Sequence, residues 1–285
     1  MRALCSIPAQ LLRNTANATK LAATSGNFEL CNRRYKSSGP QKMNWKQDVV
    51  YLYQFPRPAT KAPSLSPFCL KIETFLRVYG IKYESISSWI TLKQSPRGLL
   101  PFIELNGQQI ADSQVIVWTL QKHFKIEDSL KGEERGTARA LERMIDLSTN
   151  YALLVDKTVN NAHLLLSRSV SGAPLPGFLT NIFAKRFSEI ARKRVNGVLG
   201  SLSKEELKIL LRKDIQAIDD VLGDKKFLFG DRITSTDCSV FGQLGATFYL
   251  PYRQEITDLL EDDFPRVRHY LDRIRSHYYP EWKDE

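Results

Sequence analysis

The segment SLSPFCLKIETFLRVYG, residues 64–80, contains the clearest helix signals of the chain. Ser66 has a side chain that is preferred at a helix N-cap, and Pro67 suits the first helical position, where its missing N–H is not needed. Apolar side chains then recur at helical spacing, and Gly80 ends the pattern. The apolar residues of this pattern are Leu70, Phe75, Leu76 and Tyr79. The sequence therefore predicts a helix from residue 67 to about residue 79.

A short apolar run and a proline-bearing loop precede this helix. Residues 49–55 are rich in Val, Tyr and Leu, which is typical of a strand that is buried on both faces. Pro56, Pro58 and Pro63 follow, and each fixes its own backbone and disfavours helix in the residue before it. We expect a strand followed by a long extended loop.

Further elements complete a first domain. Residues 82–87 predict a second strand, and Asn106 with Gly107 marks the turn of a hairpin. A helix over 113–124 follows. The order strand, helix, strand, hairpin, helix indicates a shortened thioredoxin-like domain over residues 48–124.

The rest of the chain has helical periodicity and no convincing strand. Apolar residues recur at helical spacing over 141–159, 179–190 and 207–222. We therefore expect an all-helical C-terminal domain over residues 133–282. The fold class predicted for the whole chain is an α/β thioredoxin-like domain followed by an all-α domain.

One more helix start is marked by Thr234 and Asp237, which have the spacing of a capping box. We expect both Pro101 and Asp237 to determine the fold whatever the function. Loss of the capping carboxylate should cost on the order of 1 kcal/mol of stability.

Residues 1–40 form a basic leader that we do not expect to belong to the fold. They are rich in Arg, Ser, Thr, Asn and Ala, and they hold a single acidic residue, Glu29. That composition is typical of a mitochondrial presequence, and Arg33, Arg34 and Tyr35 resemble a processing site. Residues 1–36 thus predict a mitochondrial protein. The alternative is an uncleaved disordered extension of a cytoplasmic protein.

Charge and composition exclude several classes of function. The formal net charge is +10, and half of that excess lies in the leader, without any nucleic-acid-binding motif elsewhere. We expect no nucleic-acid partner. Charged residues interrupt every apolar stretch too early for a membrane-spanning helix. Outside the leader only Cys69 and Cys238 remain, too far apart to indicate a disulfide, and the four histidines show no metal-ligand spacing, so we expect no metal.

At this point the sequence resembles a known superfamily. Its motifs are SPFC at 66–69, LLPFIELNG at 99–107 leading to ADS at 111–113, and TSTD at 234–237, which resemble the glutathione transferases. More specifically, LYQFP at 52–56 with SLSPFCLKIETFLRVYGIKYE at 64–84 is similar to the failed axon connections family, a branch near the metaxins. The resemblance covers about residues 48–282.

The resemblance implies a binding site for glutathione. Pro101 falls where the superfamily has a cis-proline, and Leu100 would offer its backbone to the cysteinyl part of glutathione. Asp112 and Ser113 match the pair that holds the γ-glutamyl end, since a helix N-terminus suits a carboxylate. The alternative for Asp112 and Ser113 is a turn and an N-cap with no ligand.

The resemblance also suggests two catalytic candidates. Ser66 occupies the position of the activating hydroxyl of serine-type transferases, where it would hydrogen-bond the glutathione thiolate, and Cys69 matches the second cysteine of glutaredoxins. Each has a simpler interpretation. Ser66 is a good N-cap without any chemistry, and Cys69 lies one turn into the helix, where it can be buried and inert.

Two classes of function follow. In the first, the protein is a glutathione transferase-like enzyme that conjugates or reduces small electrophiles. In the second, it is a non-catalytic, metaxin-like module for contacts with proteins or a membrane surface, with a role in axon development implied by the family name. The proline-rich loop favours the second, because it would reshape the glutathione site, and fold alone does not fix function. The superfamily also implies a homodimer.

The predicted helix over 179–195 bears on the second class. Its basic residues lie opposite an apolar stripe, and we expect the stripe to pack into the domain core and leave the basic residues in solvent; contact with an anionic membrane or an acidic partner is the alternative. The basic residues are Lys185, Arg186, Arg192, Lys193 and Arg194, and the apolar residues are Ile182, Phe183, Phe187 and Ile190.

Overall fold

A computed structural model describes residues 39–60, 62–88, 91–173 and 176–282 of the chain. The predicted presequence, with Cys5 and Cys31, lies outside the described residues. The first part of the structure has four strands, β1 (Val50–Gln54), β2 (Tyr83–Ser87), β3 (Phe102–Leu105) and β4 (Gln108–Ala111), and three helices, α1 (Pro67–Val78), α2 (Thr91–Gln94) and α3 (Ser113–Phe124).

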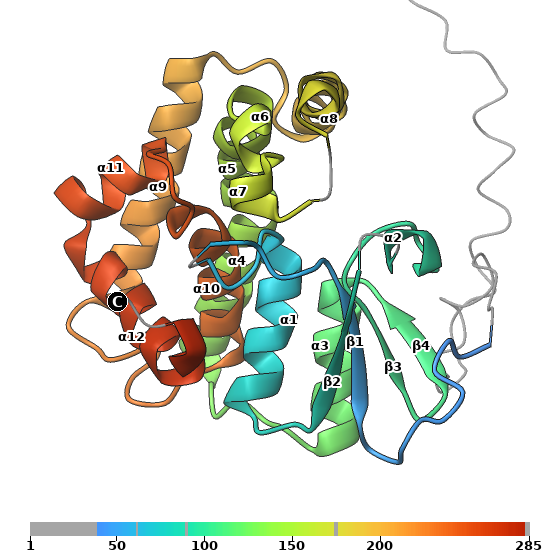
Figure 1. The fold of residues 1–285 in the computed structure, drawn as a ribbon. Coiled ribbons are helices and arrows are strands. Elements are labelled where there is room, and N and C mark those ends of the chain that lie inside the picture. The colour runs from blue at the N-terminus through green and yellow to red at the C-terminus, as the bar shows by residue number, and fades with distance from the viewer. Residues whose placement is uncertain (1–38, 61, 89–90, 174–175, 283–285) are drawn as a thin grey trace, which may run out of the picture. The chain divides into compact units, whose positions relative to one another are not determined.

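The strands form one sheet in the order β2-β1-β3-β4. β1 and β2 are parallel, and the other two pairings are antiparallel, with Tyr53 opposite Phe102 and Phe102 opposite Ala111. Figure 1 shows α1 and α3 beside this sheet, and their apolar side chains share one core with Val50 and Leu52 of β1. This is the predicted thioredoxin-like arrangement, and the predicted element bounds agree within about two residues.

The rest of the described chain is helical, which confirms the predicted fold class. Its α-helices are α4 (Gly132–Met144), α5 (Asn150–Leu154), α6 (Ala162–Leu165), α7 (Arg168–Ser171), α8 (Gly177–Leu199), α9 (Lys204–Leu222), α10 (Ser235–Phe248), α11 (Glu255–Asp258) and α12 (Pro265–Tyr278). Three segments are π-helical, η2 (Ile145–Thr149), η3 (Val155–Asn160) and η4 (Leu259–Asp263), and η5 (Pro280–Trp282) is a 3₁₀ turn. The helix predicted over 141–159 is therefore part of a longer one, from α4 to η3, with two wider π-helical turns. Among the described residues, no helix combines the length and apolar character that a membrane crossing requires.

The two parts of the fold are joined by a close contact between α1 and α10. Gly242 of α10 lies against the backbone of Lys71 in α1, and a Cβ at this glycine would be 2.7 Å from the Lys71 Cα atom. The Lys71 side chain is buried, and its Nζ lies 2.8 Å from Oδ2 of Asp146 in η2, while Gln243 donates to the other oxygen. A buried ion pair therefore crosses the boundary between the two parts.

The capping carboxylate of α10 is more deeply buried than the sequence indicates. Asp237 is fully buried, and its Oδ2 accepts hydrogen bonds of 2.7 Å from both the backbone N–H and the hydroxyl of Thr234. Its Oδ1 accepts from the backbone N–H of Leu228 and from the Tyr270 hydroxyl. Asp237 thus joins three segments as well as capping one helix.

Helix α8 differs from its prediction. Its apolar stripe, which we expected to enter the core, is exposed, and the helix is buried instead through Ala184, Ala191 and Val195. Periodicity identifies the apolar side of a helix but does not show which side a neighbour covers. Here the neighbours α5, α6 and η3 contact the side with the small residues.

Candidate functional site at one edge of the sheet

Three chain segments that carry predicted site residues meet at one edge of the sheet. β1 ends there, β3 begins there after Pro101, and β4 ends there before Asp112, because Tyr53, Phe102 and Ala111 lie side by side in the register. The first turn of α1 approaches the same edge, since Cys69 shares an apolar cluster with Leu100, Phe102 and Ala111. The fold thus brings most of the predicted site residues into one region.

The peptide bond between Leu100 and Pro101 is cis. Leu100 is only 8% exposed, yet neither its backbone N–H nor its C=O has a hydrogen-bond partner within the part of the chain that the structure describes. Backbone groups of well-buried residues are nearly always paired. One donor and one acceptor are therefore available next to the proline.

Asp112 caps helix α3 in a left-handed backbone conformation, with φ of 85°. Its Oδ1 accepts from the backbone N–H groups of Gln114 and Val115, at 3.0 and 3.3 Å. Its Oδ2 lies 3.9 Å from Nη1 of Arg97. The capping interpretation of Asp112 thus holds, but it uses only one of the two carboxylate oxygens.

The first turn of α3 has further polar groups without partners. Among the described residues, neither the N–H nor the hydroxyl of Ser113 makes a hydrogen bond, and Oε1 of Gln114 is buried without one. The N-terminus of a helix also favours negative charge. Next to Leu100, this turn therefore offers two donors for a carboxylate and one acceptor for an ammonium group.

Ser66 and Cys69 interact with each other in the first turn of α1. Ser66 Oγ accepts from the Cys69 backbone N–H at 3.4 Å, which is the N-cap interaction predicted from sequence. Cys69 is fully buried, and burial raises the pKa of its thiol to about 12, although hydrogen bonds from the Ser66 hydroxyl and the Phe55 backbone act in the opposite direction. The thiol is therefore protonated at neutral pH, and thiolate chemistry is not available to it in this arrangement.

The proline-bearing loop before α1 packs on the helical part of the fold. The Ala59 N–H donates to the Val170 carbonyl at 3.0 Å, and Ala62 is buried against Leu165 and Val170. Arg57 pairs with the buried carboxylate of Glu73 and lies over the ring of Trp282, with its Cζ 4.7 Å from the ring centroid. The described residues of the loop are thus held by contacts to both parts of the fold.

A buried lysine lies directly behind this loop. Lys157 of η3 is 4% exposed, and its Nζ donates to the carbonyl of Leu65 at 2.7 Å and to that of Ala246 at 2.6 Å. No carboxylate pairs with it among the described residues, and burial lowers the pKa of its amine from 10.5 to about 7. Since Leu65 precedes Ser66, the amine fixes the entry to α1 from the second part of the fold.

Sequence reasoning missed Lys157, Arg97 and Gln114. Lys157 lies two positions from Val155 and from Val159, which belong to the apolar pattern over 141–159, so a regular helix would direct its side chain away from the core. The π-helical turn was not predictable. Arg97 and Gln114 become site residues only through contacts between segments. For Arg97, the one available signal was the position of this cation in the sequence, close to Pro101.

Comparison with known proteins agrees with this fold. The family model described as glutathione S-transferase N-terminal domain matches residues 67–163, and the glutathione S-transferase C-terminal domain model matches residues 211–274. The chain belongs to the glutathione transferase superfamily. Within it, the chain is a member of the branch that contains failed axon connections and the metaxins, as the following similarities show.

Failed axon connections of Drosophila melanogaster is 30% identical over 258 residues, which cover 85% of this chain and 61% of that protein. This chain thus spans less than two thirds of that relative. Isoprene-epoxide–glutathione S-transferase of Rhodococcus sp. strain AD45 is 28% identical over 230 residues, 78% of this chain and 96% of that enzyme. Metaxin-2 of Mus musculus is 22% identical over 250 residues, 84% of this chain and 91% of that protein.

Solved structures show the same fold. A glutathione transferase of Phanerochaete chrysosporium has a TM-score of 0.58 at 15% identity, covering 84% of this chain and 99% of its own. A glutathione S-transferase of Ceriporiopsis subvermispora, solved in complex with glutathione, has a TM-score of 0.51 at 17% identity, covering 83% and 98%.

Proposed function

We propose that the protein binds glutathione at this edge of the sheet through Leu100, Pro101, Asp112 and Ser113. The observation that carries the proposal is the set of backbone and hydroxyl groups at Leu100 and Ser113 that have no partner among the described residues. Glutathione matches this set, because its cysteinyl residue has one backbone N–H and one C=O, and its γ-glutamyl end has a carboxylate and an ammonium group.

Each group of the site has a distinct task in this proposal. Leu100 pairs with the backbone of the cysteinyl residue, and the N–H and hydroxyl of Ser113 hold the γ-glutamyl carboxylate at the positive end of α3. Oδ2 of Asp112, which does not take part in the cap, and Oε1 of Gln114 accept from the ammonium group. The glutathione complex of the Ceriporiopsis relative supports this choice of ligand.

Conservative replacements in the first turn of α3 test the binding site. Asn is as good an N-cap as Asp, so Asp112→Asn removes the charge and keeps the cap, and Ser113→Ala removes one donor. We expect each to weaken glutathione binding by about tenfold or more, because each removes an interaction with a charged group. Isothermal titration of the full chain measures the affinity, and thermal unfolding checks that stability is unchanged. Absence of glutathione binding by the unaltered chain at millimolar ligand would refute the proposal.

We further propose that the protein is an enzyme that transfers glutathione to small electrophiles such as epoxides. The name of the Rhodococcus relative supports this substrate class. Glutathione supplies the nucleophilic thiol when it is bound. Of the two sequence candidates, Ser66 can donate a hydrogen bond to a bound thiolate, whereas Cys69 has a packing role.

Ser66→Ala separates binding from turnover. We expect it to leave glutathione affinity within about threefold and to lower kcat by about 10²-fold, because a hydrogen bond to the thiolate is lost. Ser66→Thr keeps both the hydroxyl and the N-cap and should retain most of the turnover. Measured rates of epoxide conjugation for the two variants decide the role. Equal rates in Ser66→Ala and the unaltered chain would show that Ser66 is only an N-cap.

A non-catalytic interaction module is the second candidate. One observation in its favour is that the side chains of Ser66 and Cys69 already interact with each other at the start of α1. The other is the similarity to metaxin-2. In this case glutathione binds as a structural ligand or not at all, and partners contact other surfaces. Glutathione binding without any conjugation across a panel of electrophiles is the result that selects it.

A further inference from the structure

Helix α8 exposes apolar side chains that soluble proteins usually cover. Ile182 is 65% exposed, Phe183 47%, Phe187 38% and Ile190 46%. Phe183, Phe187 and Ile190 have the spacing i, i+4 and i+7, so they lie on one side of the helix. Contiguous exposed apolar patches mark surfaces that bind proteins, membranes or ligands.

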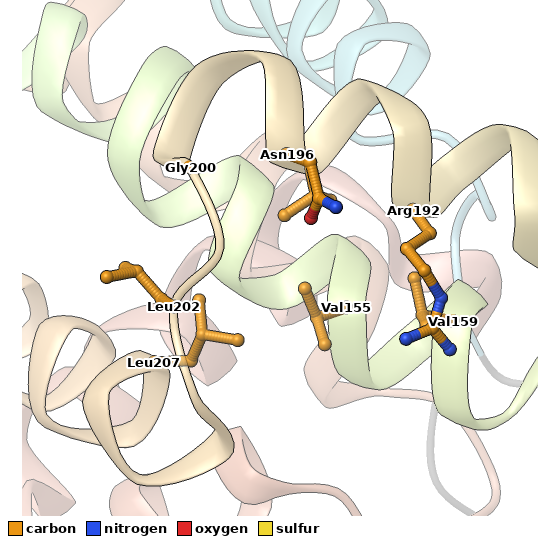
Figure 2. Close-up of a pocket in the computed structure, with 8 residues that line it drawn as sticks. Val155, Val159, Arg192, Asn196, Gly200, Leu202 and Leu207 are labelled. Carbon is orange, nitrogen blue, oxygen red and sulfur yellow. The ribbon is translucent and has the colours of Figure 1, made fainter.

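The attachment of α8 leaves that side free. Small buried side chains of α8 pack against the long helix that runs from α4 to η3. A cavity of about 70 Å³ lies between α8 and this long helix. Figure 2 shows Arg192 and Asn196 of α8 above Val155 and Val159 of η3 at this cavity. Phe183, Phe187 and Ile190 are not among the residues that line this cavity.

Basic side chains border the exposed apolar residues. The exposed cations of α8 are Lys185, Arg186, Arg192, Lys193 and Arg194, and Glu189 is the one acidic residue within Gly177–Leu199. Arg186 follows Phe183 by three positions and Lys193 follows Ile190 by three, so both lie next to the apolar side. None of the five cations forms an ion pair with any other described residue. Arg186 and Lys193 therefore form one surface with the exposed apolar residues, and do not lie on the opposite side of the helix as the sequence suggested.

We propose that α8 lies on the surface of a bilayer that contains anionic phospholipids. Phe183, Phe187 and Ile190 enter the boundary between headgroups and acyl chains, and Arg186 and Lys193 reach the lipid phosphates and carboxylates beside them. Amphipathic helices with aromatic residues on one side and Lys and Arg at its border bind membranes in this way, and each cation near the surface contributes to the attraction. This inference is independent of glutathione binding.

Charge decides between the candidate occupants of this surface. A second copy of the chain would bring Arg186 and Lys193 of one α8 helix against the same cations of the other, and like charges across an interface are unfavourable. An anionic bilayer supplies negative charge and an apolar interior over the same area. It is therefore the occupant that matches both properties of the surface.

Vesicle flotation with the full 285-residue chain tests the proposal. Two vesicle compositions are compared, phosphatidylcholine alone and phosphatidylcholine with phosphatidylserine. Two double variants are measured beside the unaltered chain, Phe183→Gln with Phe187→Gln and Arg186→Glu with Lys193→Glu. Ile209→Gln is the matched control, because Ile209 is also an exposed apolar residue of a helix, in α9. The basic leader is the same in every chain, so it cannot account for a difference between variants.

We expect binding to vesicles with phosphatidylserine that weakens as salt is added, and a loss of about tenfold or more in each double variant. Ile209→Gln should bind like the unaltered chain. Circular dichroism spectra of all the chains are compared, and equal spectra show that the variants keep their helix content. Equal binding by the Phe183 and Phe187 variant would overturn the proposal, as would a dimer in light scattering that this variant converts to a monomer. A stable complex with an acidic protein, without binding to the anionic vesicles, would overturn it as well.

Discussion

Replacing Asp237 with alanine is expected to lower the free energy of unfolding by about 4 kcal/mol, because a buried hydrogen-bond network loses its acceptor. The Thr234 cap accounts for about 1 kcal/mol of that loss. The backbone N–H of Leu228 and the hydroxyl of Tyr270 make up the rest, since both donate to Oδ1 and would be left buried without a partner. We therefore expect a larger loss than the cap alone would give.

Urea unfolding followed by circular dichroism measures this loss. Glu206→Ala is the matched control, because Glu206 closes the same type of capping box with Ser203 at the start of α9 but is exposed. We expect a much smaller loss for Glu206→Ala. A double variant combines Asp237→Ala with Tyr270→Phe. Its loss of unfolding free energy should be smaller than the sum of the losses of the two single variants, since both changes remove the same hydrogen bond. Equal losses for Asp237→Ala and Glu206→Ala would mean that the buried contacts contribute little.

Replacing Lys157 with methionine is expected to change how stability depends on pH. The amine has a pKa of about 7 in the folded protein and 10.5 as its ordinary value. Between these values the unfolded chain binds a proton that the folded chain does not, so stability of the unaltered protein rises with pH. Within this window, the free energy of unfolding of the unaltered protein should rise, relative to that of Lys157→Met, by about 1.4 kcal/mol per pH unit.

Unfolding free energies at pH 7.5 and pH 9.5 provide the measurement. The difference between the unaltered chain and Lys157→Met should grow by about 3 kcal/mol over that range. Taking the difference cancels the titration of groups that both chains share. Lys208→Met, at a partly exposed lysine paired with Glu255, should show no such rise. A constant difference for Lys157→Met would show that the buried amine keeps its ordinary pKa.

The elements that could be predicted are those with local signals. Ser66, Pro67 and Gly80 mark the ends of α1 by the backbone chemistry of N-caps and C-caps, and Asn106 with Gly107 marks the hairpin turn. These effects act over a few residues and need no knowledge of tertiary contacts. The positions of the predicted glutathione-site residues follow from the same signals, because they lie at the ends of these elements.

The features that could not be predicted depend on contacts between distant segments. Nothing near Lys157 indicates that a π-helical turn directs its amine to Leu65 and Ala246. The exposure of Phe183 and Phe187 depends on which side of α8 meets the long helix, and periodicity is the same in either case. For Asp237 the motif was visible, but the two additional donors come from residues 9 and 33 positions away.

The interlocking of the two parts of this fold limits how such a chain can change. Three contacts join the two parts. They pair the Lys71 ammonium with Asp146, the Leu65 carbonyl with Lys157, and the backbone of Lys71 with Gly242. A hybrid that joined this sheet to the helices of another transferase would separate all three pairs at once, and would leave Lys71 buried without its anion. We therefore expect a relative with lysine at the position of Lys71 to have an acidic residue at the position of Asp146.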